Sequence, residues 1–329
     1  MKTIAVLLTK KYRPLSIAAI LDVFETVNSY YQEQEGQPYF NIRLVRTDDD
    51  SQTPNLHDGY EPVTLSSIDS SHLILIPAFA TTGDMAAFVQ ENQAFIPWIC
   101  DQFETGSEIA SFCTGAFLLA ATGLLNGRKA TTHVNAARMF AHYFPEVLLQ
   151  EDKVVTDDSG IYTSGGATST FHLLLYLLEK YCRKETAIRT AKVFAIDMDR
   201  ELQSYFADFV PSRNHNDSLV LEAQQRMEQR FQEGCTVEEL IHDLPASRRN
   251  FIRRFKIATG ITPIEYLQRL RIEAAKKLLE GSDCSITEVM FQSGYNDAKA
   301  FRLLFSRLVG ITPRSYREKY AGKKLLSMA

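Results

Sequence analysis

The chain has 329 residues, of which 45% are hydrophobic and 23% are charged, a composition typical of a soluble globular protein long enough for two domains. No apolar run is long enough to cross a bilayer, and the apolar start is too short for a signal peptide, so we expect a cytoplasmic protein. The five scattered cysteines form neither a disulfide framework nor a metal motif, and we expect neither a metal nor a cofactor.

The net charge of −4 conceals an asymmetry along the chain. Residues 210–329 contain 20 Lys and Arg against 14 Asp and Glu, whereas the preceding residues contain 16 against 26. A basic segment behind an acidic one is typical of a nucleic-acid-binding module that is fused to a different domain.

The first 181 residues alternate between apolar strand-like runs and helical patterns. We expect strands at 3–9, 40–47, 72–77 and 108–113, and helices at 16–28, 86–103, 114–125, 135–143 and 169–181. Apolar strands in alternation with helices indicate an α/β fold, a doubly wound and mostly parallel sheet of the flavodoxin-like kind with helices on both faces.

One junction in this region has the pattern of a nucleophile elbow. The apolar run 109–112 leads directly into a helical pattern with Cys113 at the turn, and the small residues Ser111 and Gly115 flank it. We expect the helix dipole to favour the thiolate and to lower the pKa of Cys113. His133 follows a further short strand-like run.

Two stretches carry a resemblance to a known family: SFCTGAFLLAATGLLNGRKATTH (111–133) and YTSGGATSTFHLLLYLLE (162–179). Residues 1–183 resemble the PfpI/ThiJ branch of the class I glutamine amidotransferase-like superfamily. The resemblance places Cys113 at the family's nucleophile and His133 at its frequent histidine partner.

Two departures from the enzymes of that family indicate that this domain is not an enzyme. The loop after the first strand reads KKYRPL (10–15) and lacks the carboxylate of the enzymatic relatives. The turn after the central strand reads PAFATT (77–82) where the enzymes have a glycine-rich oxyanion turn. We therefore expect no catalytic residue, and instead a ligand site at the strand ends. The expected site residues are Ala78, Phe79, Cys113, Thr114 and His133. The expected ligand is a small effector such as an amino acid, an amine or a betaine.

The segment 184–217 joins the two parts of the chain. Within it, residues 188–209 have a helical pattern that we expect to mediate formation of a homodimer, and its end, PSRNHND, is polar and typical of a linker.

The last third of the chain is a duplicated unit, predicted at 218–329. GITPIEYL (260–267) and GITPRSYR (310–317) are offset by fifty residues, and Phe251 and Phe255 match Phe301 and Phe305 at the same offset. Each copy reads as two helices joined by a tight turn, the helix-turn-helix pattern.

Capping residues set the expected helix boundaries. In the first copy Thr236 and Ser247 begin the two helices and Gly260 ends the second; Ser285, Asp297 and Gly310 do the same in the second copy. A connecting helix from Thr262 to Gly281 would be roughly 27 Å long, close to the ~34 Å of one DNA turn.

The stretches SRRNFIRRFKIATGITPIEYLQRLR (247–271) and SGYNDAKAFRLLFSRLVGITPRSYR (293–317) resemble the AraC-type DNA-binding domain over about 218–320. Together with the first domain they resemble the GlxA-like regulators. The resemblance implies these DNA-contacting residues: Arg248, Arg249, Asn250, Arg253, Ala298, Lys299 and Arg302. One departure is Leu303, which stands where the family usually has an arginine, as at Arg253.

These patterns predict a sequence-specific transcription regulator that binds double-stranded operator DNA, responds to a small metabolite near Cys113 and works with RNA polymerase. Two alternatives stay open. One is a cysteine-dependent amidase, hydrolase or glyoxalase-like enzyme with a DNA-binding tail. The other is an oxidant sensor at Cys113, for which no second cysteine lies near in sequence.

Overall fold

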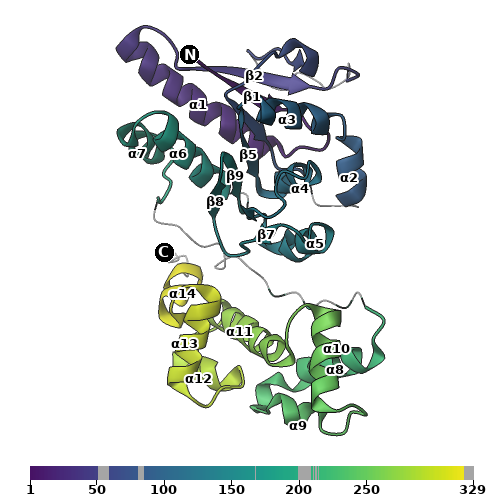
Figure 1. Cartoon of the computed structure of the whole chain (residues 1–329). Helices are drawn as coiled ribbons and strands as arrows, with labels where there is room; N and C mark the ends of the chain where they lie inside the picture. Colours follow the sequence, from purple (N-terminus) through teal and green to yellow (C-terminus); the bar gives the residue numbers. More distant parts are fainter. Residues whose placement is uncertain are drawn as a thin grey trace, which may run out of the picture. The chain divides into compact units, whose positions relative to one another are not determined.

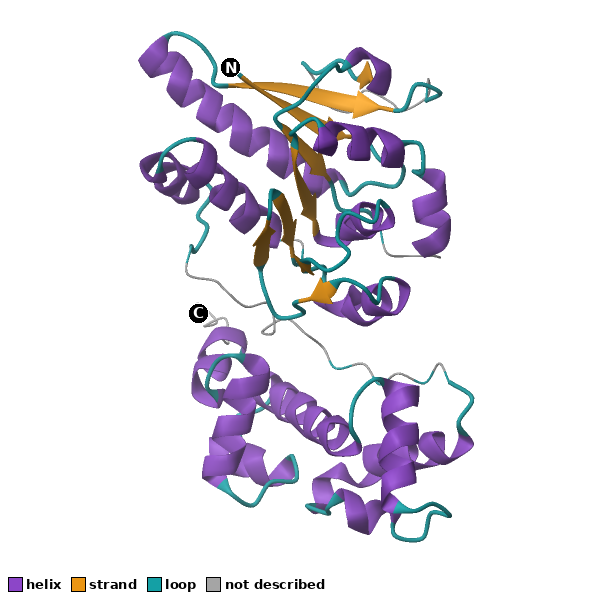
Figure 2. Cartoon of the chain, in the orientation of Figure 1, coloured by secondary structure: helices purple, strands orange, loops and turns teal. Residues whose placement is uncertain are grey.

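The computed structural model describes residues 1–50, 59–80, 85–166, 168–198, 209, 211, 213 and 215–321. The chain divides into two compact units, residues 1–203 and 204–329. The first unit combines a sheet with helices, and the described part of the second unit is helical (Figures 1 and 2).

A seven-stranded sheet forms the centre of the first unit, in the order β3-β2-β1-β4-β5-β9-β8. All neighbouring strands run parallel except β8, which pairs antiparallel with β9. The strands are β1 (Lys2–Leu7), β2 (Phe40–Arg46), β3 (Val63–Thr64), β4 (Leu73–Ile76), β5 (Glu108–Phe112), β8 (Val155–Asp158) and β9 (Ile161–Ser164). The separate pair β6 (Lys129–Ala130) and β7 (Leu148–Leu149) is also parallel.

Helices cover both faces of this sheet, which confirms the doubly wound α/β fold (Figure 2). One face packs against α1 (Pro14–Glu35), α6 (Ser169–Tyr181) and α7 (Lys184–Val193). The other packs against α2 (Met85–Glu91), α3 (Phe95–Glu104), α4 (Ala116–Ala121) and α5 (Ala137–Tyr143). Strand residues alternate between the two cores: Leu73 and Leu75 of β4 face the first, whereas Ile74 and Ile76 face the second.

Local differences from the expected elements have physical causes. The single helix expected at 86–103 is two helices, α2 and α3, with Asn92 between them. The buried Asn92 amide donates to the Phe88 carbonyl and accepts from the backbone N–H of Lys10. The helix expected at 114–125 is a 3₁₀ turn, Cys113–Gly115, followed by the six residues of α4. The short strand β6 corresponds to the strand-like run expected before His133, whereas the short strands β3, β7, β8 and β9 were not expected.

The described helices of the second unit are α8 to α14. Their bounds are α8 (Ser218–Arg230), α9 (Val237–Ile241), α10 (Arg248–Thr259), α11 (Pro263–Gly281), α12 (Ile286–Gln292), α13 (Ala298–Val309) and α14 (Pro313–Tyr320). The expected caps are confirmed: each capping side chain accepts a hydrogen bond from the first helical turn, and Gly260 and Gly310 end α10 and α13 in the left-handed conformation.

The helix α11 belongs to both hydrophobic cores of this unit. Tyr266 and Leu267 pack with Phe251 and Phe255 in the first core. Further along the helix, a second set of residues packs around Phe301 and Phe305; these are Ile272, Ala275 and Leu279. Each helix-turn-helix therefore has its own core, and one continuous helix connects the two.

The segment expected to join the domains is divided between the units. Its helix α7 buries Ala187 and Ala191 in the core of the first unit. Residues 199–208 of the expected dimerisation helix lie outside the described residues. Phe209 packs edge-on against Tyr266 and Arg213 pairs with Glu228, so both residues pack within the second unit, to which they belong.

Candidate ligand site and nucleic-acid interface

Cys113 lies at a sharp turn between β5 and α4. Its backbone has a φ of 55°, the left-handed conformation that non-glycine residues seldom adopt. A Cβ at Gly115 would lie 2.6 Å from the carbonyl oxygen of Ile76 and 2.7 Å from that of Pro77. Only glycine therefore lets this turn approach the end of β4, and the expected elbow geometry is present.

The expectation of an acidic thiol at this turn is wrong. Cys113 is only 3% exposed, and burial raises its pKa to about 11. The hydrogen bonds from the backbone and hydroxyl of Thr114 and the positive charge of Arg13 act in the opposite direction and do not outweigh burial. The following helix, α4, has only six residues, so its dipole is small.

The turn at Ala78 and Phe79 contributes two backbone N–H groups beside the elbow. The N–H of Ala78 donates to Ser16 Oγ at 3.0 Å, and the N–H of Phe79 donates to Thr114 Oγ1 at 2.9 Å. The Thr114 hydroxyl donates in turn to the Phe79 carbonyl at 2.9 Å. Both N–H groups are thus engaged inside the protein, although an oxyanion would need them as donors.

The loop after β1 covers this turn. Tyr12 forms an antiparallel bridge with Phe79, and the N–H of Arg13 donates to the Ala78 carbonyl at 2.7 Å. Phe79 is fully buried and packs against Phe88 and Phe117 in the core, so its ring is not at a surface that a ligand could reach. Of the expected ligand-site residues, Phe79 is therefore a core residue that supports the elbow. Ala78, Cys113 and Thr114 are buried too, and His133 alone is partly exposed.

His133 is partly buried and caps the 3₁₀ turn Val134–Ala136. Its Nδ1 accepts a hydrogen bond from the N–H of Asn135 at 3.1 Å. In the neutral ring the proton is then on Nε2. Burial, and secondarily the charge of Arg13, lowers the pKa of His133, so the ring is held neutral.

Arg13 is a site residue that the sequence reasoning did not select. Its side chain is exposed, its Nε donates to the Phe79 carbonyl at 3.4 Å, and its charge acts on both Cys113 and His133. The nearby Lys11 instead pairs with Glu91 at 2.7 Å. The signal that identifies it in the sequence is the group of three cations in the loop KKYRPL (10–15).

In the second unit, α10 exposes a cationic face. Arg248, Arg249, Asn250, Arg253 and Lys256 are all exposed, while Phe251 and Phe255 are buried on the opposite side. Two of the arginines on this helix have ionic partners: Arg248 pairs with Glu238 at 2.7 Å, and Arg254 binds Asp217 through two hydrogen bonds of 2.6 and 2.8 Å.

The equivalent helix α13 exposes a different set of side chains. Ala298, Lys299, Arg302 and Leu303 are exposed, and Phe301 and Phe305 are buried. The expected DNA-contacting residues therefore all lie on accessible surface, in two groups on helices of the same length that are capped in the same way.

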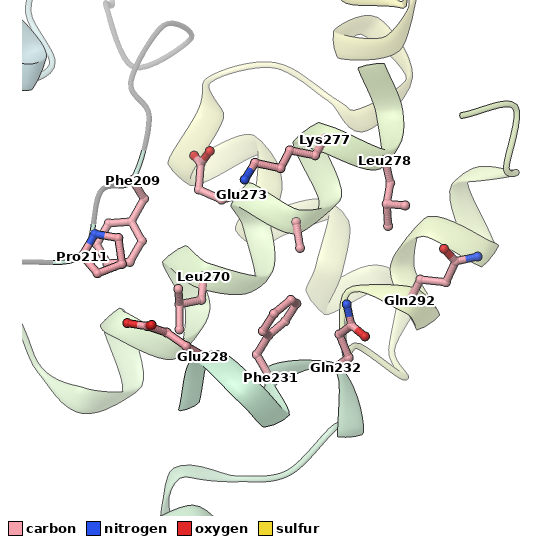
Figure 3. Close-up of a pocket in the computed structure, with 11 residues that line it drawn as sticks. Phe209, Pro211, Glu228, Phe231, Gln232, Leu270, Glu273, Lys277, Leu278 and Gln292 are labelled. Atoms are coloured by element: carbon pink, nitrogen blue, oxygen red, sulfur yellow. The ribbon is translucent and has the colours of Figure 1, made fainter. Parts of the chain in front are cut away.

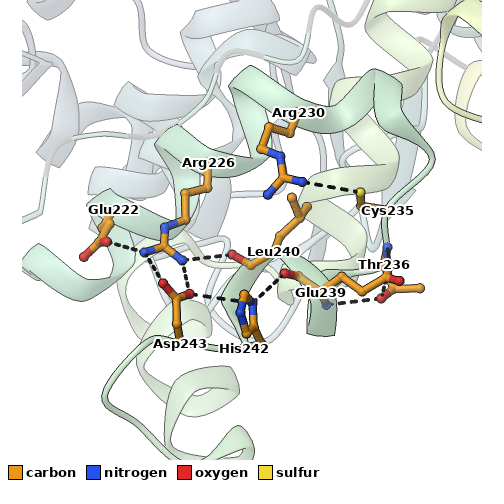
Figure 4. A network of polar contacts seen from close by, with 9 residues as sticks. All are labelled: Glu222, Arg226, Arg230, Cys235, Thr236, Glu239, Leu240, His242 and Asp243. Atoms are coloured by element: carbon orange, nitrogen blue, oxygen red, sulfur yellow. Dashed lines mark hydrogen bonds and ion pairs between the residues drawn. The ribbon is translucent and has the colours of Figure 1, made fainter.

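Polar contacts fix the first helix of the first motif against α8 (Figure 4). Arg226 of α8 pairs with Asp243 and donates to the Leu240 carbonyl at 3.3 Å, both at the end of α9. At the start of α9, Thr236 and Glu239 form a reciprocal capping box. These contacts hold α9 in the position from which α10 projects.

Arg271 of α11 connects the two motifs. It donates to the carbonyls of Phe231 and Cys235, both at 2.8 Å, and its guanidinium lies over the ring of Tyr295. Gly294, in the turn of the second motif, has a φ of 85° and packs so tightly that a Cβ would overlap the Phe231 carbonyl oxygen. Backbone from the 3₁₀ turn Phe231–Glu233, which leads into the first motif, therefore packs directly against the turn of the second.

A cleft of about 730 Å³ lies beside α11 (Figure 3). Its walls combine apolar side chains such as Phe231, Leu270 and Leu278 with the carboxylates of Glu228 and Glu273. Lys277 lines the cleft as well, and both carboxylates have cationic partners, Arg213 for Glu228 and Lys276 for Glu273.

The described residues contain no group of three or more His, Cys, Asp and Glu side chains placed to hold a metal ion. None of the described helices is both long and apolar enough to span a membrane.

Two family models match this chain. Residues 73–180 match the DJ-1/PfpI family, and residues 227–319 match a helix-turn-helix domain. The region that matches the DJ-1/PfpI family contains the Cys113 elbow, and the region that matches the helix-turn-helix domain contains α10 and α13.

Regulators are among the similar proteins. CdhR, an HTH-type transcriptional regulator of Pseudomonas aeruginosa, is 26% identical over 69% of this chain and 65% of its own length. RhaS, an HTH-type transcriptional activator of Salmonella schwarzengrund, is 35% identical over 32% of this chain and 37% of its own. The match thus covers less than two thirds of either relative.

Among solved structures, a protein from Vibrio parahaemolyticus described as a transcriptional regulator superposes with a TM-score of 0.50. It is 24% identical, and the superposition covers 58% of this chain and 98% of that one. This likeness concerns the fold.

Proposed function

We propose that this chain, which joins a DJ-1/PfpI domain to a helix-turn-helix domain of the AraC type, is a transcription regulator that binds operator DNA and responds to a small metabolite. The observation that carries the proposal is the pair of equivalent helices α10 and α13, each with an exposed cationic face and each fixed to α11.

The proposed DNA interface uses the two helices in different grooves. With 19 residues, α11 is about 28 Å long, which suits two successive major grooves about 34 Å apart. Arg249, Asn250 and Arg253 have the donor groups that read guanine and adenine edges, whereas Lys299 and Arg302 suit phosphates. Arg248 and Ala298 flank these positions at the helix starts. The ion pair of Arg248 with Glu238 is exposed and weak, so a phosphate could replace it.

The proposed effector site is the elbow, with Arg13 as its cation. Cys113, Thr114 and His133 surround the turn, and Ala78 and Phe79 support it. Arg13 is exposed and acts on both Cys113 and His133, so a carboxylate would gain a charge-assisted hydrogen bond there. Amino acids and betaines carry this group, and an amine without a carboxylate does not.

Three features of the elbow support binding without turnover. The thiol has a raised pKa, so little thiolate exists at neutral pH. The proton on Nε2 of His133 leaves that nitrogen unable to act as a base. The N–H groups of Ala78 and Phe79 already have partners. The raised pKa of Cys113 also disfavours the oxidant sensor, which needs a reactive thiolate.

A homodimer and contact with RNA polymerase are part of the same proposal. Because α7 buries Ala187 and Ala191 in its own unit, dimerisation through this helix would use its outer face, where Val193 is exposed. Sedimentation equilibrium of the full chain tests the dimer.

The effector site is tested by thermal shift with glycine betaine, L-glutamate and ethanolamine as probes. We expect stabilisation by a carboxylate-bearing probe, its loss in Arg13→Ala, and its retention in the matched control Lys10→Ala. An equal response of wild type and Arg13→Ala would contradict this site. Incubation with glutamine, short peptides and methylglyoxal tests the enzyme alternative, since turnover that is lost in Cys113→Ser would establish it.

A further inference from the structure

Leu303 is a large exposed aliphatic side chain on the helix face that also carries Lys299 and Arg302. It is 64% exposed, and it lies opposite Phe301 and Phe305, through which α13 packs on its core. On a helix its neighbours are the residues three and four positions away, among them the exposed Lys299, Ala300 and Arg307. A large apolar group in this place contributes nothing to the core of the unit.

The duplication defines what Leu303 replaces. Both α10 and α13 have twelve residues, begin after a capping side chain and end at a left-handed glycine. Leu303 therefore occupies the same helical position as Arg253, and both side chains are exposed. Likewise Ala300 occupies the position of Asn250. The first helix thus presents hydrogen-bond donors at two positions where the second presents only methyl groups.

We propose that Leu303 reads the C5-methyl group of a thymine in the major groove, which makes it a specificity-determining residue of the second helix. This inference rests on the proposed DNA-binding function. A leucine side chain has no donor or acceptor, and the one apolar feature that a major groove offers it is the thymine methyl. Ala300, one turn before it, adds a second small apolar surface. Lys299 and Arg302 then hold the phosphates on either side.

The operator consequently has two chemically different blocks. The block under α10 contains guanine or adenine read by Arg253 and Asn250, and the block under α13 contains at least one thymine read through its methyl. Loss of one buried methyl lowers affinity about three- to fivefold.

The test uses a duplex enriched from a random library by the full chain. Each thymine is replaced in turn by deoxyuridine, which removes only the methyl, and affinity is measured by fluorescence anisotropy at fixed salt. We expect one or two thymines in a single block to show a three- to fivefold loss with wild type. The same substitutions should have no effect with Leu303→Ala.

Two further variants complete the test. Ile264→Ala is the matched control, because Ile264 is 60% exposed but lies on α11, and it should keep the full methyl effect. Leu303→Arg should shift the preferred base at that position to guanine. The proposal is overturned if no thymine shows a methyl effect, or if the effect persists in Leu303→Ala. A chain that enriches no duplex at all would instead overturn the proposed DNA-binding function.

Discussion

Gly294→Ala tests the contact that holds the two helix-turn-helix motifs together. At a φ of 85°, an alanine costs ~1–2 kcal/mol of backbone strain, of which ~0.4–1 kcal/mol is offset by a less flexible unfolded chain. The added Cβ would also overlap the Phe231 carbonyl oxygen. Relieving the overlap requires Phe231 to move, which adds ~1–3 kcal/mol of overpacking and weakens the hydrogen bond from Arg271.

Gly260→Ala is the matched control for the backbone strain. Gly260 has a φ of 79°, and a Cβ there would have no atom within 4 Å. We expect Gly260→Ala to cost about 1 kcal/mol and Gly294→Ala about 2–4 kcal/mol more than that.

Two spectroscopic signals distinguish the unfolding of the two units when the full chain is unfolded in urea. The only tryptophan, Trp98, lies on α3 of the first unit, so its fluorescence reports that unit alone, whereas far-UV circular dichroism also reports the helices of the second. Gly294→Ala should shift the circular-dichroism transition and leave the Trp98 transition unchanged. Equal costs for the two glycine variants would refute the tight contact between the motifs.

Three further variants probe the elbow, the link to the recognition helix and the base contacts. Because burial raises the pKa of Cys113 to about 11, the unfolded state releases this proton first as pH rises. Between about pH 9 and 11, wild type should therefore lose about 2 kcal/mol of unfolding free energy relative to Cys113→Ser. A constant difference between the two proteins would contradict the buried thiol. Asp217→Asn keeps the cap of α8 but removes the charge that Arg254 binds, so its unfolding free energy in urea should fall by about 1 kcal/mol. An unchanged unfolding midpoint would show that this partly exposed pair contributes nothing to stability. In anisotropy titrations at fixed salt, Arg253→Ala should cost ~1–3 kcal/mol of operator-binding free energy and relax specificity at one base pair. Lys299→Ala should lower the affinity for all duplexes alike. Unchanged operator affinity in Arg253→Ala would mean that the recognition face is elsewhere.

Features that depend on a few adjacent residues could be predicted from the sequence. The caps at Thr236, Ser247, Ser285 and Asp297 act within one helical turn, so their spacing alone predicted where the four helices begin. The duplication at an offset of fifty residues also gave the correct pairing of α10 with α13.

Features that depend on contacts between distant segments could not be predicted from the sequence. The elbow at Cys113 was predicted, but its raised pKa was not, because the thiol is buried in the folded unit and the loop near Arg13 pairs with the turn near Ala78. The same long-range pairing brings Arg13 to the site. No sequence motif indicates the hydrogen bonds that Arg271 donates to the carbonyls of Phe231 and Cys235.

Recognition of a particular DNA sequence by this chain is measured by the ratio of two affinities. Fluorescence anisotropy at one salt concentration gives the dissociation constants of the full chain for the enriched duplex and for a scrambled duplex of the same composition. We expect the enriched duplex to bind at least ~10³-fold more tightly, as specific regulators do. Equal dissociation constants for the two duplexes would contradict it.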